Sequence, residues 1–396
     1  MSLSSTFLLF IVGVGILQGV FLAFLLVFHP KSERTVNKFL ALYILGYCIP
    51  MMTPVVQHFF SWQLLALIDP ILLLLGPFLY LYVCSFKEKI TFRKAWPHFL
   101  LFLIIIGYDI HLYLVFSDQY PSSSQIPPEV PKLPSSMARV FVRIGQMTTY
   151  FFLASRALTS YQRSIQHLFS ETSKINLAWV RWLINGYIVL LLIMISLYLL
   201  ILRNPENFGL IILINTAIVT PYLYAVAYRG LTQPTLWQVR HEMIKDNRHN
   251  KTQEVDDIDE LIHSVEPKNQ KAGVNQERIE DIASGVTALM KESKLYLQSE
   301  LTLQDLADKL DIPAYQVTQA INEGLRKNFY DLVNGYRVDE AKRLLQDPVS
   351  RNSKILSVGM DAGFNSKTTF NTVFKKFTGL TPSEFKEQQQ KDLMQA

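Results

Sequence analysis

Seven long apolar stretches in the first 228 residues constrain this chain more than any other feature of its sequence. An α-helix rises about 1.5 Å per residue, so about 20 apolar residues cross the roughly 30 Å hydrocarbon core of a bilayer. Prolines inside such stretches are tolerated when neighbouring helices satisfy the freed carbonyl groups. The stretches cover residues 5–28, 36–59, 62–86, 97–116, 137–161, 178–202 and 208–228. We therefore predict that residues 1–228 form a seven-helix transmembrane bundle.

The charged residues between these stretches indicate how the predicted bundle lies in the membrane. Connectors that carry many Lys and Arg residues remain in the cytoplasm during insertion. The second connector has no Lys or Arg, whereas the first, third and fifth contain or adjoin Lys31, Arg34, Lys38, Lys87, Lys89, Arg93, Lys94, Arg163, Lys174 and Arg181. This alternation predicts an N-terminus outside the cell and a cytoplasmic location for everything after Tyr228.

Four ionisable residues lie inside the predicted spans, where charge is costly and usually has a function. Asp69 is in the third span, Asp109 and His111 are in the fourth, and Arg143 is in the fifth. The predicted topology places all four at a similar depth, in the outer leaflet. They form either a polar pocket for an extracellular ligand or a structural Asp–Arg pair with side chains that reach the interface. The structural interpretation is favoured.

The C-terminal part of the chain has a different character, because residues 286–390 carry 14 Lys and Arg against 13 Asp and Glu. Within it, residues 361–382 predict a helix that begins near Ser366 and ends at Gly379. One face of this helix is an apolar stripe at three- and four-residue spacing, made of Phe370, Val373, Phe374 and Phe377. The opposite face presents Lys367, Thr368, Asn371, Thr372 and Lys375.

A short helix and a sharp turn come before this polar-faced helix. Gly359 is small where two crossing helices must approach, and Gly363 suits a turn with positive φ. A small residue, a turn residue and then a polar-faced helix form the pattern of a helix-turn-helix motif. On such a helix, short polar side chains reach base edges in the major groove and lysines neutralise phosphates.

The same pattern occurs upstream, in residues 301–325. Ala307 is the small crossing residue, Asp311 takes the turn, and Pro313 suits the start of the next helix. That helix is predicted to bury Val317, Ala320 and Ile321 and to expose Tyr315, Gln316, Thr318 and Gln319. Residues 328–345 predict a helix that joins the two motifs.

Together these elements resemble the DNA-binding domain of the AraC/XylS family of bacterial transcription regulators. The matching motifs are "LTLQDLADKLDI", "YRVDEAKRLL", "DAGFNSKTTFNTVFKK" and "GLTPSEF", in that order within residues 301–386. The resemblance implies two helix-turn-helix motifs that read successive major-groove segments about 34 Å apart. It implies base contacts from Tyr315, Thr318, Gln319, Lys367, Thr368 and Thr372, with Gln316, Asn371 and Lys375 beside them, and phosphate contacts from Arg337 and Lys376. Gly359 stands where the family usually has Ala.

Residues 229–285 are predicted to form a cytoplasmic linker between the bundle and this domain. The end of the linker begins a helix in which Ile279, Ile282, Val286 and Leu289 recur at helical spacing. This helix either pairs two protomers as a short coiled coil or packs as the leading helix of the DNA-binding domain. The domain is predicted at residues 286–390, and residues 391–396 are a tail.

The sequence thus predicts an all-α protein, a one-component transcription regulator anchored in a bacterial cytoplasmic membrane. Its expected partners are the lipid bilayer, double-stranded promoter DNA, RNA polymerase, a second copy of the chain and an unknown small-molecule or membrane signal. A ligand would shift the bundle between two arrangements, and the linker would pass that shift to the DNA-binding domain. The alternatives are a transporter or channel with a regulatory tail and, in third place, a membrane enzyme. No motif for catalysis, a metal or a cofactor is evident, so none is expected.

Overall fold

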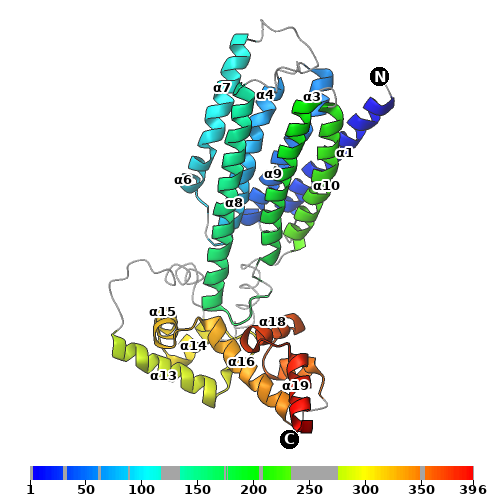
Figure 1. Ribbon diagram of the computed structural model, residues 1–396. Helices are drawn as coiled ribbons and strands as arrows, with labels where there is room; N and C mark the ends of the chain where they lie inside the picture. Colours follow the sequence, from blue (N-terminus) through cyan, green and yellow to red (C-terminus); the bar gives the residue numbers. More distant parts are fainter. Residues whose placement is uncertain are drawn as a thin grey trace. The chain divides into compact units, whose positions relative to one another are not determined.

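The computed structural model describes residues 3–29, 34–60, 64–87, 90–116, 134–173, 175, 177–204, 208–232, 275–347 and 353–395. These residues are helical apart from short turns and one isolated antiparallel bridge, and no strand occurs among them. The chain divides into two compact units (Figure 1). We call Met1–Thr159 with Leu177–Glu242 the apolar unit, and Ser160–Asn176 with Met243–Ala396 the polar unit. The prediction of an all-α fold is confirmed for the described residues.

The apolar unit contains the predicted spans, except for residues 160 and 161 at the end of the fifth. Its elements in chain order are α1 (Leu3–Phe28), α2 (Arg34–Met51), α3 (Thr53–Phe59), α4 (Leu65–Ile68), η2 (Asp69–Leu74), α5 (Leu75–Cys84), α6 (Phe92–Ala95), η3 (Trp96–Phe99), α7 (Leu100–Phe116), α8 (Pro134–Leu168), α9 (Ala178–Arg203) and α10 (Phe208–Thr232). Helix α8 passes from one unit into the other, because its residues from Ser160 onwards belong to the polar unit.

All seven apolar stretches are helical, but two of them are interrupted. Residues 36–59 form α2 and α3, and residues 62–86 include α4, η2 and α5. Proline accounts for both breaks: Pro54 lies in the first turn of α3 and Pro70 in the first turn of η2. A proline in a first turn costs no hydrogen bond, since that N–H has no partner within the helix. The number of membrane crossings stays a prediction.

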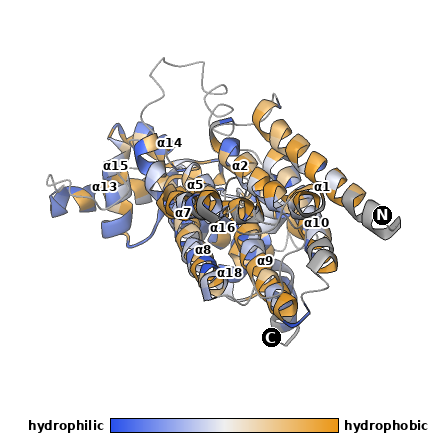
Figure 2. Cartoon of the chain, turned by 90° about the horizontal axis from the view of Figure 1, so that it is seen from above, coloured by the Kyte–Doolittle hydropathy of each residue, from blue (hydrophilic) through white to orange (hydrophobic). Residues whose placement is uncertain are grey.

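Two described helices are long and apolar enough to cross a membrane, Phe10–Phe28 within α1 and Ala178–Arg203, which is α9. Two shorter apolar helical stretches cover Val36–Met51 and Asp69–Cys84. All but five of the exposed large apolar side chains among the described residues belong to the apolar unit. Figure 2 shows the same contrast, since α1 is mostly hydrophobic and α13 has long hydrophilic stretches.

Small residues allow close contact between helices of the apolar unit. Gly186 of α9 lies against the ring of Tyr222 in α10. A methyl group at Gly76 of α5 would lie 2.8 Å from the ring of Tyr150 in α8. Small residues at helix contacts are typical of bundles in lipid, where close packing drives helix association.

The polar unit has two apolar cores joined by one long helix. Its elements are α13 (Gln276–Glu292), η7 (Leu295–Leu297), α14 (Leu303–Leu310), α15 (Ala314–Gln319), η8 (Ala320–Gly324), α16 (Phe329–Gln346), α17 (Ile355–Asp361), α18 (Lys367–Thr378) and α19 (Pro382–Gln395). Helix α16 supplies Leu332 and Val333 to the first core and Val338 and Ala341 to the second. It is the predicted linking helix.

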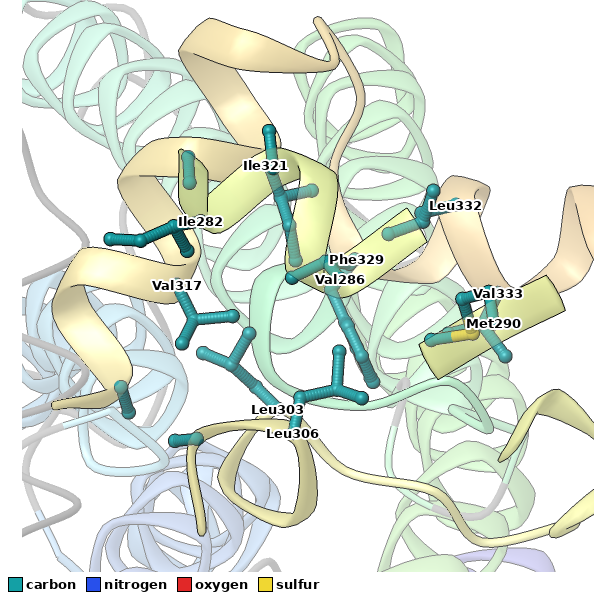
Figure 3. Close-up of a cluster of buried hydrophobic side chains, with 14 of the residues drawn as sticks. Ile282, Val286, Met290, Leu303, Leu306, Val317, Ile321, Phe329, Leu332 and Val333 are labelled. Atoms are coloured by element: carbon teal, nitrogen blue, oxygen red, sulfur yellow. The ribbon is translucent and has the colours of Figure 1, made fainter. Parts of the chain in front are cut away.

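Helix α13 resolves an alternative that the sequence left open. Its apolar face, Ile279, Ile282 and Val286, is buried in the first core with residues of α14, α15 and α16 (Figure 3). The face that would form a coiled coil is therefore used within one chain, and α13 is the leading helix of the domain. The predicted boundary at residue 286 falls inside this helix.

Candidate nucleic-acid interface

The first helix-turn-helix motif is formed by α14, a turn and α15. Thr302 caps α14: its hydroxyl accepts the backbone N–H of Asp305, and the Asp305 carboxylate accepts the N–H of Thr302 at 2.7 Å. Asp311 ends the helix in the left-handed region, with φ of 53°, as predicted. Pro313 occupies the N-cap position of α15 without a side-chain hydrogen bond, and α15 continues into the π-helical turn η8.

The outward face of α15 differs in one position from the prediction. Tyr315 is 40 % exposed, and Gln316 and Gln319 are half-buried. Thr318 is only 6 % exposed, and its hydroxyl donates to the carbonyl of Ala314 at 3.0 Å. The prediction that Thr318 faces outward is wrong, because Thr318 lies on the same side of the helix as buried Ala314.

The second motif is formed by α17, a turn and α18, and its helix ends match the prediction. The Ser366 hydroxyl accepts the backbone N–H of Thr369 at 3.1 Å, which caps α18 at its start. Gly379 ends the helix with φ of 79°, and Gly363 makes the preceding turn with φ of 91°. The three local features that define the motif are thus confirmed.

The apolar stripe of α18 is buried over three of its four predicted positions. Phe370, Val373 and Phe374 lie in the second core. Phe377, the last residue of the stripe, is 39 % exposed. It lies at the end of the stripe opposite Gly335 of α16, which has no side chain to cover it.

The polar face of α18 is open, as predicted. Lys367, Thr368, Thr372 and Lys375 are exposed, and Asn371 is half-buried. The face offers short hydroxyls and one amide toward the start of the helix and lysines at both ends. This arrangement is suited to base edges and phosphates in a major groove.

Lys376 also lies on the surface, but it has a partner within the chain. Its ammonium forms an ion pair with the Asp331 carboxylate of α16 at 2.6 Å. Both side chains are partly exposed, so the pair is weak and a phosphate could displace the carboxylate. The predicted phosphate contact of Lys376 stays a prediction.

Gly359 explains how α17 and α18 cross. A methyl group at this position would lie 2.5 Å from Cδ1 of Phe370 and 2.9 Å from its Cγ. The aromatic ring of Phe370 therefore occupies the space that an alanine side chain would need. The crossing residue of this motif is glycine because its partner is a phenylalanine.

Arg337 does not have the position expected of a phosphate ligand. It is 0 % exposed, inside α16, and its guanidinium contacts the chain on several sides. Nε donates to the Tyr296 carbonyl at 2.7 Å, and Nη2 lies 2.6 Å from the Gln298 carbonyl and 3.2 Å from that of Ser299. The predicted phosphate contact is wrong, because the guanidinium is buried and all three of its nitrogens donate to groups of the chain itself.

Burial lowers the pKa of Arg337 to about 10. This value remains well above neutral pH, so the guanidinium stays charged at pH 7. A buried charge must be satisfied by hydrogen bonds. Arg337 is therefore a structural residue that holds the region between the two motifs.

Of the four ionisable residues predicted within the apolar unit, two pair with each other, one pairs with a further arginine, and one is exposed. Arg143 pairs with Asp69, and Arg139 pairs with Asp109 at 2.8 Å. Arg143 and Asp109 are buried, whereas His111 is exposed. The expected Asp–Arg pair is present, and the sequence did not identify Arg139 as the partner of Asp109. A ligand site at these residues stays a prediction.

A buried tyrosine cluster in the apolar unit was not found by sequence reasoning. The hydroxyl groups of Tyr43 and Tyr222 lie 3.2 Å apart, and the ring centroid of Tyr43 is 5.2 Å from Tyr47 and 6.5 Å from Tyr187. These residues come from α2, α9 and α10, which are far apart in the sequence. Only the packing of the helices brings them together.

Among the described residues, no group of three His, Cys, Asp or Glu side chains is placed to hold a metal ion.

Residues 306–388 match a protein-family model that is described as a helix-turn-helix domain. This match includes most of α14 and all of α15 to α18, so it covers both motifs. It supports an AraC-type DNA-binding domain in this part of the chain. No curated protein and no solved structure matches the chain.

Proposed function

We propose that this chain is a membrane-anchored, one-component transcription regulator that binds specific DNA sequences with two helix-turn-helix motifs. The observation that carries the proposal is the pair of recognition helices within residues that match a helix-turn-helix family. The polar face of α18 is open, and Tyr315 is exposed on α15, the corresponding helix of the first motif. DNA binding is thus supported at both motifs.

The recognition residues divide by their chemistry. Tyr315, Gln316 and Gln319 on α15, and Thr368, Asn371 and Thr372 on α18, have the short or planar polar groups that read base edges. Lys367, Lys375 and Lys376 supply positive charge for phosphates. The domain is nearly neutral overall, with 14 basic and 13 acidic residues in 286–390. We expect two copies of the chain to bind together, because each supplies little electrostatic attraction.

The apolar unit supports anchoring in a membrane. It exposes most of the large apolar side chains of the described residues, which would be unfavourable in water over so large a surface. The proposed orientation has seven crossings, the N-terminus outside a bacterial cytoplasmic membrane and the polar unit in the cytoplasm, where it reaches promoter DNA and RNA polymerase. The charged pairs Asp69–Arg143 and Asp109–Arg139 are the proposed place where a signal acts.

The proposed orientation predicts where a reporter is active. A fluorescent protein that matures only in the cytoplasm is expected to be bright when fused after Ala396. The same protein fused after Ser123, in the predicted outer connector, is expected to be dark at equal abundance. Whole-cell fluorescence with quantitative immunoblotting measures both. A dark fusion after Ala396 would contradict the proposal, because the polar unit would then never meet the chromosome.

The proposed recognition face predicts loss of specific binding in one double variant. Changing Lys367→Ala together with Thr368→Ala removes a phosphate contact and a base contact, and we expect discrete genomic occupancy to be lost, with specific affinity at least about tenfold lower. The measurement is genome-wide occupancy of the tagged full-length chain.

The matched control is Lys291→Ala together with Thr287→Ala on α13, which makes the same chemical changes outside the two recognition helices. This control is expected to keep the occupancy of the wild type. Unchanged peaks in the Lys367→Ala and Thr368→Ala variant would show that α18 does not read DNA.

A further inference from the structure

A segment from the middle of the chain folds as part of the DNA-binding half. Residues 160–176 comprise the end of α8, up to Leu168, and the connection to α9, yet they belong to the polar unit. We call them the docking segment. The Tyr161 hydroxyl donates to the Ile175 carbonyl at 2.9 Å, which closes the segment on itself. The family match at residues 306–388 does not include it, so it is an addition to the matched domain.

The docking segment is built into the first motif. Leu168 is buried in the first core, and Phe169 packs against that core. Phe169 forms an antiparallel backbone bridge with Thr302, the residue that caps α14. The backbone N–H and the hydroxyl of Ser170 both donate to the Leu301 carbonyl, at 3.3 and 2.6 Å. The docking segment is therefore hydrogen-bonded to the start of α14.

The next contacts reach the linking helix and the second motif. The Ser170 carbonyl accepts from Nδ2 of Asn334 at 3.1 Å, and its hydroxyl accepts from Nη2 of Arg337 at 3.2 Å. A carboxylate oxygen of Glu171 accepts from the Thr369 hydroxyl of α18 at 3.4 Å. Ser170, Asn334 and Arg337 are each 0 % exposed. Two consecutive residues thus touch the first motif, the linking helix and the recognition helix of the second motif.

We propose that the docking segment holds the two helix-turn-helix motifs in the relative position that reads DNA, and that it is the route by which the apolar unit controls them. This inference rests on the proposed DNA-binding function. The docked state is the binding state, because the segment leaves Tyr315, Lys367 and Thr372 exposed and covers no recognition face. Docking therefore positions the motifs and does not block them.

Chain connectivity makes this segment suited to carry a signal. It is joined at one end to Thr159 and at the other to Leu177, both in the apolar unit. A shift of α8 along α9 must therefore pull on the segment at both ends. A buried polar network such as the one around Ser170 is fully satisfied or broken, so it responds to such a pull in two states.

Replacing one hydroxyl tests the proposal. Full-length chain in lipid nanodiscs is titrated with duplexes that the wild type has enriched from a random-sequence pool. Ser170→Ala removes the hydroxyl contacts to Arg337 and Leu301, and we expect affinity to fall about tenfold. Ser173→Ala, an exposed serine of the same segment, is expected to bind as the wild type does. Equal binding by Ser170→Ala and the wild type would overturn the proposal.

A disulfide lock between the docking segment and the start of α14 distinguishes loss of docking from general destabilisation of the protein. Phe169→Cys with Thr302→Cys places two thiols on opposed residues of an antiparallel bridge, where Cα atoms are about 4.5 to 5.5 Å apart and a disulfide fits. In a background with Cys48→Ala and Cys84→Ala, the oxidised lock is expected to restore the affinity that Ser170→Ala loses, and reduction is expected to remove it again. Failure of a formed disulfide to restore binding would also overturn the proposal.

The same titration distinguishes this inference from the function on which it rests. If the Lys367→Ala and Thr368→Ala variant binds the duplexes as the wild type does, the proposed recognition face is wrong. If that variant loses binding while Ser170→Ala does not, DNA binding stands and the docking proposal alone is wrong.

Discussion

Replacing Arg337 by Met is expected to lower the free energy of unfolding of the polar unit by about 3 to 5 kcal/mol. Methionine has a similar length, so little space is lost. It cannot donate a hydrogen bond, so the carbonyls of Tyr296, Gln298 and Ser299 would lose their guanidinium donor. A buried carbonyl without a partner costs about 1 to 3 kcal/mol, and several are affected together.

Native-state hydrogen exchange of the α16 backbone amides in the full-length chain measures this effect, because it reports the opening of that helix alone. Arg337→Lys is expected to fall between the wild type and Arg337→Met, since a lysine keeps the charge but cannot reproduce the planar fork. Arg343→Met is the matched control on the same helix. Arg343 is exposed and forms an ion pair with Glu340 at 2.8 Å on the same helix, so its loss is expected to change exchange little. Unchanged exchange in Arg337→Met would show that the buried network is not stabilising.

Replacing Gly363 by Ala is expected to lower the free energy of unfolding by about 2 to 5 kcal/mol, the other large effect in this protein. Two separate costs add. Gly363 has φ of 91°, a conformation that strains any residue with a Cβ atom by about 1 to 2 kcal/mol. The new methyl group would also lie 2.5 Å from the Tyr296 carbonyl oxygen and 2.9 Å from Cα of Leu297, and overpacking against backbone costs about 1 to 3 kcal/mol.

Gly379→Ala is the control that separates the cost of the steric clash from the cost of the conformational strain. Gly379 also has positive φ, 79°, but nothing lies within 4 Å of the position a methyl group would take. It should therefore show the conformational strain without the clash. Hydrogen exchange of the α18 amides in both variants gives the comparison. Equal losses in the two variants would mean that the contact between Gly363 and residues 296–297 is not tight.

Arg337 and Gly363 both lie next to the same backbone carbonyl, that of Tyr296. This explains why both substitutions are expected to lower the free energy of unfolding strongly. The Tyr296 carbonyl accepts from Arg337 and lies where a side chain of residue 363 would be. Tyr296 belongs to the first core, whereas Gly363 makes the turn of the second motif. This carbonyl thus lies close to the turn of the second motif, and we expect the relative position of the two motifs to depend on it.

The two helix-turn-helix motifs could be predicted in detail because their signals are local. The cap at Ser366 and the left-handed residues Asp311, Gly363 and Gly379 each depend on a few neighbouring residues. Backbone sterics and helix capping act over that distance, so the sequence contains the whole cause. The linking helix at residues 328–345 was also predicted from its local sequence.

The errors occurred where a side chain depends on partners far away in the chain. Arg337 is polar and stands on a helix next to DNA-reading motifs, so its sequence context suggests a phosphate contact. Its actual partners at residues 170, 296 and 298 are distant in sequence. Thr318 is a second example, because it is buried by the residues that surround it in the fold and its own position in the sequence does not reveal this.

The sequence by itself determined that the apolar half is helical, that two helix-turn-helix motifs follow, and where those helices begin and end, since propensity, capping and periodicity operate within a few residues. Only the tertiary structure decided that residues 160–176 fold with the DNA-binding half, that Arg337 is buried there, and that α13 packs within its own chain. These outcomes depend on which distant groups can satisfy one another's hydrogen bonds and cover one another's apolar surface, and no local pattern records that choice.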